Sequence, residues 1–339
     1  MKGVLLINLG SPDSTSPKDV RRYLGEFLMD KYVIDIPVFQ RTLLVKGIIL
    51  NTRPKKSAAA YKKIWWDEGS PLIVLSERFK EKVAKNCSIP VALGMRYGTM
   101  SIQKGMQELV DQGVTEILAV PLYPHYAMST TLTVEEKVKE VQKKHFSSVK
   151  VDFLESFYNK EEYIDVLSKT VADKLYYEEF DHILFSYHGV PERHILKTDP
   201  TKSHCKIDGS CCNQKSEAHK YCYRHQCFET TKLVAQKLGL KEGTYSDAFQ
   251  SRLGRDPWLQ PYTDKEIERL AEEGKTKIAV MTPAFVADCL ETLEEIAMEG
   301  KEEFFEAGGK EFMHIPCLND NDDWVAVMNK WIDNWISKN

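Results

Sequence analysis

The fold is decided by the stretch His182-Ile183-Leu184-Phe185-Ser186-Tyr187-His188-Gly189, an apolar run that ends at a turn. A run of four to eight mostly apolar residues between turn signals is typical of a strand that is buried on both faces of a parallel sheet. Three further runs in this half of the chain have the same character: Thr244–Phe249, Lys277–Thr282 and Glu311–Cys317. Helical patterns separate these runs, so they predict a parallel sheet with crossover helices.

The first half of the chain repeats this rhythm. Its predicted strands are Val4–Leu9, Pro90–Arg96, Glu116–Pro121 and Lys150–Glu155. Predicted helices lie near Ser101–Gln112, Thr133–Lys144 and Lys160–Tyr176, and in the second half near Glu229–Leu238, Asp264–Gly274, Asp288–Glu306 and Asp323–Ile336. We therefore predict an α/β fold of two Rossmann-like domains, each with a four-stranded parallel sheet flanked by helices. Domain I spans 1–177 and domain II spans 178–318, with the last helix, 319–339, packing back onto domain I.

Composition excludes several classes of function. The net charge is −4, and a nucleic-acid binder would instead concentrate Lys and Arg. No Gly-rich dinucleotide or phosphate loop follows a strand, which argues against a dehydrogenase or an NTPase. The run Val4–Ile7 is too short for a signal core, and Val38–Leu50 is too short to span a bilayer. We expect a cytoplasmic protein, whose eight cysteines indicate metal or redox chemistry rather than disulfides.

His188 is the first candidate catalytic residue. It follows an apolar strand directly and precedes Gly189, so the turn exposes it at the carboxyl edge of the sheet, where such folds bind ligands. An imidazole suits proton transfer near neutral pH. The alternative is a histidine that is hydrogen-bonded into the turn for structural reasons, and the pattern alone leaves both open.

A row of carboxylates is the second candidate. Asp288, Glu291, Glu295 and Glu299 fall at helical spacings of three and four just after a predicted strand. A solvated helix face would explain the row by itself. Its start at the ligand-binding edge of the sheet favours a path for protons or cations.

Seven segments together resemble the ferrochelatase family, in the family's order and over essentially the whole chain. They are Asn8–Pro12, Tyr61–Pro71, Gly94–Tyr97, Tyr123–Tyr126, Ser186–Pro191, Gln250–Leu259 and Asp288–Glu295. The resemblance implies an enzyme that inserts Fe²⁺, its substrate metal, into protoporphyrin IX to give protohaem, with release of two protons.

The resemblance also implies roles for single residues. His188 is the base or metal contact, and Glu291 takes part in proton removal or metal delivery, so these two would also be the Fe²⁺ contacts. Asp288, Glu295 and Glu299 would continue the acidic path. The positions that match porphyrin-binding residues are Leu9, Arg53, Tyr61, Ser70, Arg96, Tyr126 and Trp258.

Two departures from the family pattern matter. Cys289 stands where many relatives carry His, which puts a second histidine near Glu291 in doubt. Leu9 stands where coproporphyrin-type enzymes carry Tyr, which favours protoporphyrin IX as the substrate.

An apolar stretch within 24–50 matches the lip that covers the pocket in this family. Its apolar members are Phe27, Leu28, Met29, Val38, Phe39, Leu43, Leu44, Ile48 and Ile49. We expect about half of them to pack in the core and the others to touch a membrane surface peripherally.

Five cysteines crowd one segment with the spacing C-x5-C-C-x9-C-x4-C. Spacing alone fits a zinc site, with His204, His219 and His225 as further ligands, as well as an iron–sulfur site. Resemblance to some bacterial ferrochelatases favours a [2Fe–2S] cluster. Its expected ligands are Cys205, Cys212, Cys222 and Cys227, with Cys211 as an alternative ligand.

The sequence leaves three other functions open. One is a Co²⁺ or Ni²⁺ chelatase for a related tetrapyrrole, and another is a coproporphyrin III ferrochelatase. A third is a non-catalytic porphyrin or haem carrier with an iron–sulfur sensor. The presence of both His188 and Glu291 argues against the carrier.

Overall fold

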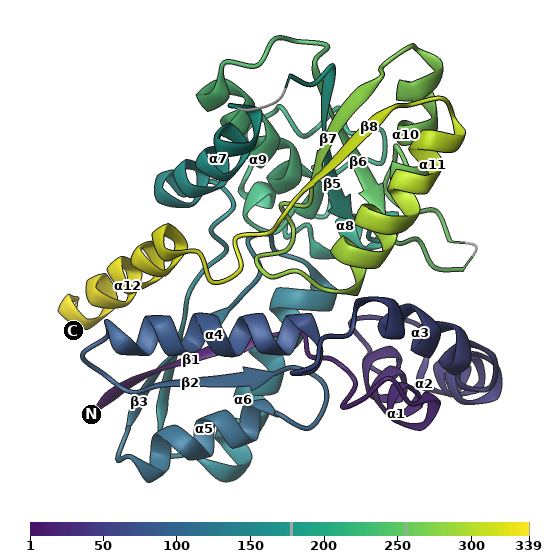
Figure 1. Ribbon diagram of the computed structural model, residues 1–339. Coiled ribbons are helices and arrows are strands. Elements are labelled where there is room, and N and C mark those ends of the chain that lie inside the picture. Colours follow the sequence, from purple (N-terminus) through teal and green to yellow (C-terminus); the bar gives the residue numbers. More distant parts are fainter. Residues whose placement is uncertain (177–178, 255, 339) are drawn as a thin grey trace. The chain divides into compact units, whose positions relative to one another are not determined.

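The computed structural model describes residues 1–176, 179–254 and 256–338 (Figure 1). The chain forms two compact units. Unit 1 consists of Met1–Tyr123, Met128–Glu155 and the C-terminal residues from 319, and unit 2 of Pro124–Ala127 and Ser156–Leu318. Each unit is described by itself.

Unit 1 contains a four-stranded parallel sheet in the order β2-β1-β3-β4. Its strands are β1 (Lys2–Asn8), β2 (Val91–Met95), β3 (Glu116–Pro121) and β4 (Lys150–Phe153). Figure 1 shows α4 (Pro71–Lys85) on one face and α5 (Ile102–Asp111) and α6 (Thr133–His145) on the other. The central strand β1 is therefore apolar and buried along almost its whole length. The C-terminal helix α12 (Asp322–Ser337) packs on α4, where Trp324 stacks on Phe79 with ring centroids 5.7 Å apart.

Unit 2 repeats this architecture with the order β6-β5-β7-β8. Its strands are β5 (His182–His188), β6 (Tyr245–Gln250), β7 (Lys277–Met281) and β8 (Glu311–Ile315), all parallel. Its helical segments are α7 (Glu161–Leu175), α8 (Glu192–Thr198), η3 (Glu217–Lys220), α9 (Tyr223–Leu238), α10 (Thr263–Glu272), η4 (Glu291–Gly300) and α11 (Lys301–Glu306). The core under η4 and α11 is made by Leu184, Val280, Ile296 and Phe304.

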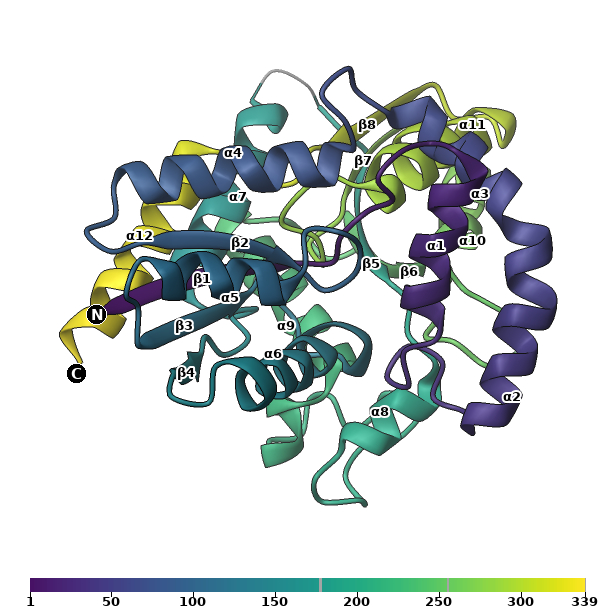
Figure 2. The same ribbon diagram turned by 90° about the horizontal axis from the view of Figure 1, so that it is seen from below.

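The apolar lip lies in a helical region of unit 1. It comprises α1 (Pro17–Leu28), α2 (Val38–Thr42) and η1 (Leu43–Ile49), followed by α3 (Leu50–Ile64), which packs against α1 (Figure 2). Leu28 is buried, whereas Val38, Phe39, Leu43 and Ile48 each have more than half of their surface exposed. In the three described ranges, no helix is long and apolar enough to cross a membrane.

The predicted fold class is confirmed, with all eight strands in two parallel sheets. The stretch predicted as one helix over Asp288–Glu306 differs: its middle is the π-helical segment η4, and Asp288 precedes it. The predicted domain boundary at 177–178 lies outside the described residues. Helix α7, placed in domain I by the strand rhythm, belongs to unit 2 because it packs on α9 and contacts β8.

Candidate active site

His188 is the last residue of β5, and its backbone is held on both sides. Its carbonyl oxygen accepts a hydrogen bond from the Tyr223 hydroxyl at 2.8 Å. The next amide, Gly189 N–H, donates to the carbonyl oxygen of Gln250 at 2.7 Å. His188 Nδ1 lies 2.6 Å from the Gly189 carbonyl oxygen. Because a carbonyl can only accept, Nδ1 carries the hydrogen, and Nε2 of the neutral ring is left with its lone pair.

Gly189 allows a close approach at this turn. A Cβ at this position would lie 2.8 Å from the Gln250 carbonyl oxygen and 3.2 Å from Cε3 of Trp258. Trp258 therefore packs against the turn that follows His188, and its Nε1 donates to the Leu253 carbonyl oxygen at 2.9 Å. Nearby, Arg255 lies outside the described residues.

The end of β6 binds the carboxylate of Glu295. The Ser251 backbone N–H donates to Glu295 Oε1 at 2.8 Å, and the Ser251 hydroxyl donates to Oε2. Ser251 has φ +67°, a left-handed conformation that turns these donors toward the carboxylate. The side chain of Gln250 donates to the backbone carbonyl of Glu291 at 2.8 Å. The tip of β6 thus fixes the beginning of η4.

Burial raises the pKa of Glu295 above its ordinary value. The Ser251 hydroxyl and the charge of His188 oppose this shift, whereas the charge of Glu291 adds to it. Glu295 is therefore close enough to His188 and to Glu291 to feel the charge of each. A carboxyl group with a raised pKa beside a histidine is suited to accept and release protons.

The acidic row is not continuous as predicted. Asp288 precedes η4 and is buried, and its Oδ1 accepts a hydrogen bond from the Thr292 hydroxyl at 2.8 Å. Cys289 is also buried, and burial raises the pKa of its thiol. Glu299 is exposed. A π-helix closes its turns with i→i+5 hydrogen bonds, so the α-helical spacings do not describe this face.

Arg96, in unit 1, already has a carboxylate partner. It forms an ion pair with Asp30, a residue of the lip with only 4% of its side chain exposed. Its Nε donates to the Thr133 hydroxyl at 2.8 Å, and the Tyr97 hydroxyl donates to Asp30 at 2.9 Å. These bonds use Nε and Nη2 of Arg96, and none of its bonds to the described residues uses Nη1.

The other residues predicted to contact the porphyrin have surroundings like those of other core or surface side chains. In unit 1, Tyr61 and Ser70 are buried, Leu9 packs partly against the core, and Arg53 is exposed. In unit 2, Tyr126 meets the ring of Tyr221 edge-on, with centroids 5.1 Å apart.

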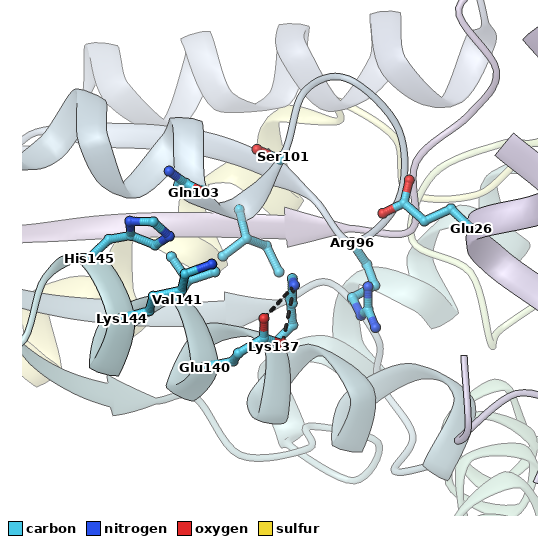
Figure 3. A pocket seen from close by; sticks show the side chains of 10 residues that line it. Glu26, Arg96, Ser101, Gln103, Lys137, Glu140, Val141, Lys144 and His145 are labelled. Carbon is cyan, nitrogen blue, oxygen red and sulfur yellow. Dashed lines mark hydrogen bonds and ion pairs between the residues drawn. The ribbon is translucent and has the colours of Figure 1, made fainter. Parts of the chain in front are cut away.

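Figure 3 shows a pocket of about 250 Å³ in unit 1. The α5 end contributes Ser101 and Gln103, and α6 contributes Lys137 and Glu140, which form an ion pair at 3.0 Å. Arg96 is the sole predicted site residue in its lining. Because pockets that bury drug-sized ligands measure about 300–1,000 Å³, this pocket is not assigned to a macrocycle.

All eight cysteines are free thiols, and the five of the predicted cluster are buried. The thiol of Cys222 lies close enough to those of Cys205 and Cys212 to affect the pKa of each. Burial raises the pKa of Cys205 to about 11. Cys211 accepts instead from Lys206 N–H at 3.2 Å and from the Arg224 guanidinium.

The histidines of this segment stack on one another rather than on the thiols. The rings of His219 and His225 are stacked with centroids 3.5 Å apart, and His204 meets His219 edge-on. Within the part of the chain that the structure describes, no set of three or more His, Cys, Asp or Glu side chains is arranged to hold a metal ion.

Two residues around the site were not foreseen. They are Tyr223, which holds the His188 turn, and Asp30, which binds Arg96. Gln250 and Ser251 belong to the segment Gln250–Leu259 that the sequence singled out after a predicted strand, although their bonds to Glu291 and Glu295 were not predicted. Tyr223 and Asp30 could not be found from the sequence, because their partners are 35 and 66 residues away in sequence.

Two comparisons of the sequence identify the same family, and a comparison of structures identifies the fold. The family model described as Ferrochelatase matches residues 1–335. The chain is 50% identical over 328 residues to a ferrochelatase of Pseudomonas fluorescens strain SBW25, covering 96% of each chain. It is 48% identical over 329 residues to a ferrochelatase of Stutzerimonas stutzeri strain A1501, again covering 96% of each. Among solved structures, SirB from Bacillus subtilis with Fe³⁺ shares the fold at 12% identity and a TM-score of 0.55, covering 98% of this chain and 94% of SirB.

Proposed function

The chain belongs to the ferrochelatase family, and we propose that it inserts Fe²⁺ into protoporphyrin IX to give protohaem in haem synthesis. The observation that carries the chemistry is the grouping of Glu295 with His188 and Glu291 at the carboxyl ends of β5 and β6. Strand ends of this kind are where doubly wound sheets bind their ligands.

Metal insertion requires that two pyrrole N–H protons leave the macrocycle. We assign the first acceptor to His188, because the bond from Nδ1 to the Gly189 carbonyl leaves Nε2 as a hydrogen-bond acceptor. Each proton passes to the carboxylate pair Glu291 and Glu295. The half-buried Glu295 is suited to hold it because desolvation raises its pKa.

The proton leaves along η4. Glu299 is exposed near the end of this segment and would pass the proton to water. We assign Asp288 to the approach of Fe²⁺ on the other side of Glu291, because its buried carboxylate lies in a polar network with Thr292. Iron is the substrate here and contacts His188 and Glu291 on its way to the ring.

We assign the porphyrin contacts to Trp258 and Tyr126 in unit 2 and, in unit 1, to a set led by Arg96. That set is Leu9, Arg53, Tyr61, Ser70 and Arg96. Nη1 of Arg96 would donate to a propionate, since Asp30 and Thr133 already hold the rest of the guanidinium in place. Leu9 in place of Tyr supports protoporphyrin IX over coproporphyrin III.

We infer that the protein works in the cytoplasm and touches the membrane through its lip. Phe39 and Leu43 are 77% and 62% exposed, and the exposed Lys46 lies close by in sequence. Large apolar side chains beside cations suit an anionic membrane surface, from which a poorly soluble porphyrin could enter. Flotation with vesicles of phosphatidylglycerol and phosphatidylethanolamine tests this: the parent should float and Phe39→Asp should not. Equal flotation of both would refute the assignment.

We assign a [2Fe–2S] cluster to Cys205, Cys212, Cys222 and Cys227, with Cys211 as the alternative ligand. The chemistry of the donors supports this, because thiolates are the usual ligands of iron–sulfur clusters, these thiols are buried, and Cys222 lies near two of the others. Bound there, the cluster would supply a one-electron redox centre. The thiols would have to lose their protons and draw together to bind it. Analysis of iron and acid-labile sulfide decides: about two of each per chain supports the cluster, and zinc without sulfide refutes it.

Anaerobic incubation with Fe²⁺ tests the main activity. Protohaem should form from protoporphyrin IX, and the coproporphyrin III reaction should have a lower kcat/KM. Binding of porphyrin without metallation would show a carrier instead of an enzyme.

A further inference from the structure

Tyr223 lies between the cysteine segment and the strand that carries His188. It is the first residue of α9, directly after Cys222, and its side chain is buried. Its hydroxyl donates to the carbonyl oxygen of His188 at 2.8 Å. This bond can affect His188 without any contact between Tyr223 and the substrate.

The bond from Tyr223 is the second of two hydrogen bonds that hold one peptide plane in place. The peptide that joins His188 to Gly189 is held at its N–H by the carbonyl oxygen of Gln250, which belongs to the neighbouring strand. It is held at its C=O by Tyr223, which comes from outside the sheet. Because the imidazole Nδ1 bonds to the carbonyl of Gly189, a rotation of this peptide would move the ring. The phenol therefore helps to set the direction of Nε2.

Tyr223 also adjoins the cysteine segment. Cys227 is four residues further along α9, so it lies on the same helix face as Tyr223, and its thiol is close enough to the phenol for the two groups to interact electrostatically. Cys227 is fully buried. The ring of His125 meets Tyr223 edge-on at 5.9 Å and limits its movement. A structural change in the cysteine segment can therefore affect His188 through a single side chain, that of Tyr223.

We propose that Tyr223 is a positioning residue that orients His188 and couples the state of the cysteine segment to it. The proposal rests on the proposed function of His188 in metal insertion. The hydrogen bond from the phenol to the His188 carbonyl carries the positioning role. The place of Tyr223 on α9, directly after Cys222 and one turn before Cys227, carries the coupling.

Tyr223→Phe tests the positioning role, because it removes the hydroxyl and keeps the ring. The matched control is Tyr163→Phe, which removes an equally buried hydroxyl that donates to another backbone carbonyl, that of Pro283, at 3.0 Å. The main measurement is the ¹H and ¹⁵N NMR shifts of the His188 ring, assigned with His188→Ala.

Tyr223→Phe should move the His188 signals and lower kcat about five- to tenfold, with the porphyrin KM changed less than about twofold. Tyr163→Phe should leave the signals in place. Unmoved His188 signals in Tyr223→Phe, or equal shifts in both variants, would overturn the positioning role.

Coupling is tested by adding Cys227→Ala, or Cys222→Ala if the first variant does not fold. The cysteine change should move the His188 signals in the parent and should not move them in the Tyr223→Phe background. An equal shift in both backgrounds would overturn the coupling. If His188→Ala kept full metallation activity while Tyr223→Phe still moved the His188 ring, the proposed function of His188 would fail and the positioning role would stand.

Discussion

Removal of the Ser251 hydroxyl should destabilise the protein by an amount that depends on pH. This hydroxyl and the Ser251 N–H hold the carboxylate of Glu295, whose pKa burial raises. A hydrogen bond to a charged group contributes about 1.5–3 kcal/mol, and one between neutral groups about 0.5–1.5 kcal/mol. Ser251→Ala should therefore lower the free energy of unfolding by about 0.5–1.5 kcal/mol where Glu295 is protonated, and by about 1.5–3 kcal/mol where it is ionised.

The sign follows from the raised pKa. A group whose pKa is higher in the folded state stabilises the fold while it is protonated, and this contribution is lost as the pH rises through the folded pKa. The Ser251 hydroxyl opposes this loss of stability because it binds the ionised form of Glu295 better than the protonated form. Loss of the hydroxyl should therefore cost more at about pH 8 than at about pH 5.

Urea denaturation at these two pH values measures the effect. Ser251→Gly is the matched control: it also lacks the hydroxyl, but glycine adopts φ +67° without strain. It should show the same pH dependence as Ser251→Ala and be more stable by about 1 kcal/mol. Equal destabilisation of Ser251→Ala at both pH values would refute the reasoning, and so would a larger loss at the lower pH.

Three further predictions concern residues held by close contacts. Gly189→Ala places a Cβ 2.8 Å from the Gln250 carbonyl oxygen and should lower the free energy of unfolding by about 1–3 kcal/mol in urea; parental stability would contradict this. Asp30→Ala leaves Arg96 without its buried partner and should cost about 3–5 kcal/mol in the same assay, and a cost below about 1 kcal/mol would exclude the ion pair as a stabilising element. Burial lowers the pKa of His125 to about 3. As the pH falls below about 6.5, this histidine therefore gains a proton in the unfolded chain but not in the folded protein, and the folded protein loses stability. His125→Gln should remove about 2 kcal/mol of the parent's loss of stability between about pH 6.5 and about pH 5, and an unchanged loss would show that His125 is not neutral in the fold.

Both sheets could be predicted because buried parallel strands stand out as apolar runs. The central strands β5 and β7 are buried along nearly their whole length and not only at every second residue, which distinguishes them from half-exposed strands. The helix α4 was not predicted, although Ser70 followed by Pro71 is a usual way to begin a helix. Its apolar face packs against β2 and α12, which the linear pattern does not show.

The positions of the candidate site residues could be predicted better than their local geometry. His188 was expected at the end of a strand, and it is the last residue of β5. Glu291 was expected on the helix that follows another strand, and it is the first residue of η4. The π-helical form of η4 could not be predicted from residue spacing, because it depends on which carbonyl oxygen each backbone N–H bonds to. For the same reason Asp288, expected on the helix, lies before it. The bond of Arg96 to Asp30 depends on a tertiary contact that no local pattern contains.

The most direct test of the proposed mechanism is anaerobic metallation of protoporphyrin IX by His188→Ala and Glu291→Gln. Exposed residues of the same types serve as controls, in His145→Ala and Glu306→Gln. Loss of a positioned acid or base costs about 10²- to 10⁴-fold in rate, so both site variants should lose at least about a hundredfold in kcat and still bind porphyrin. The controls should keep parental activity. Full activity in either site variant, with the protein folded and porphyrin bound, would contradict the assignment of the pair.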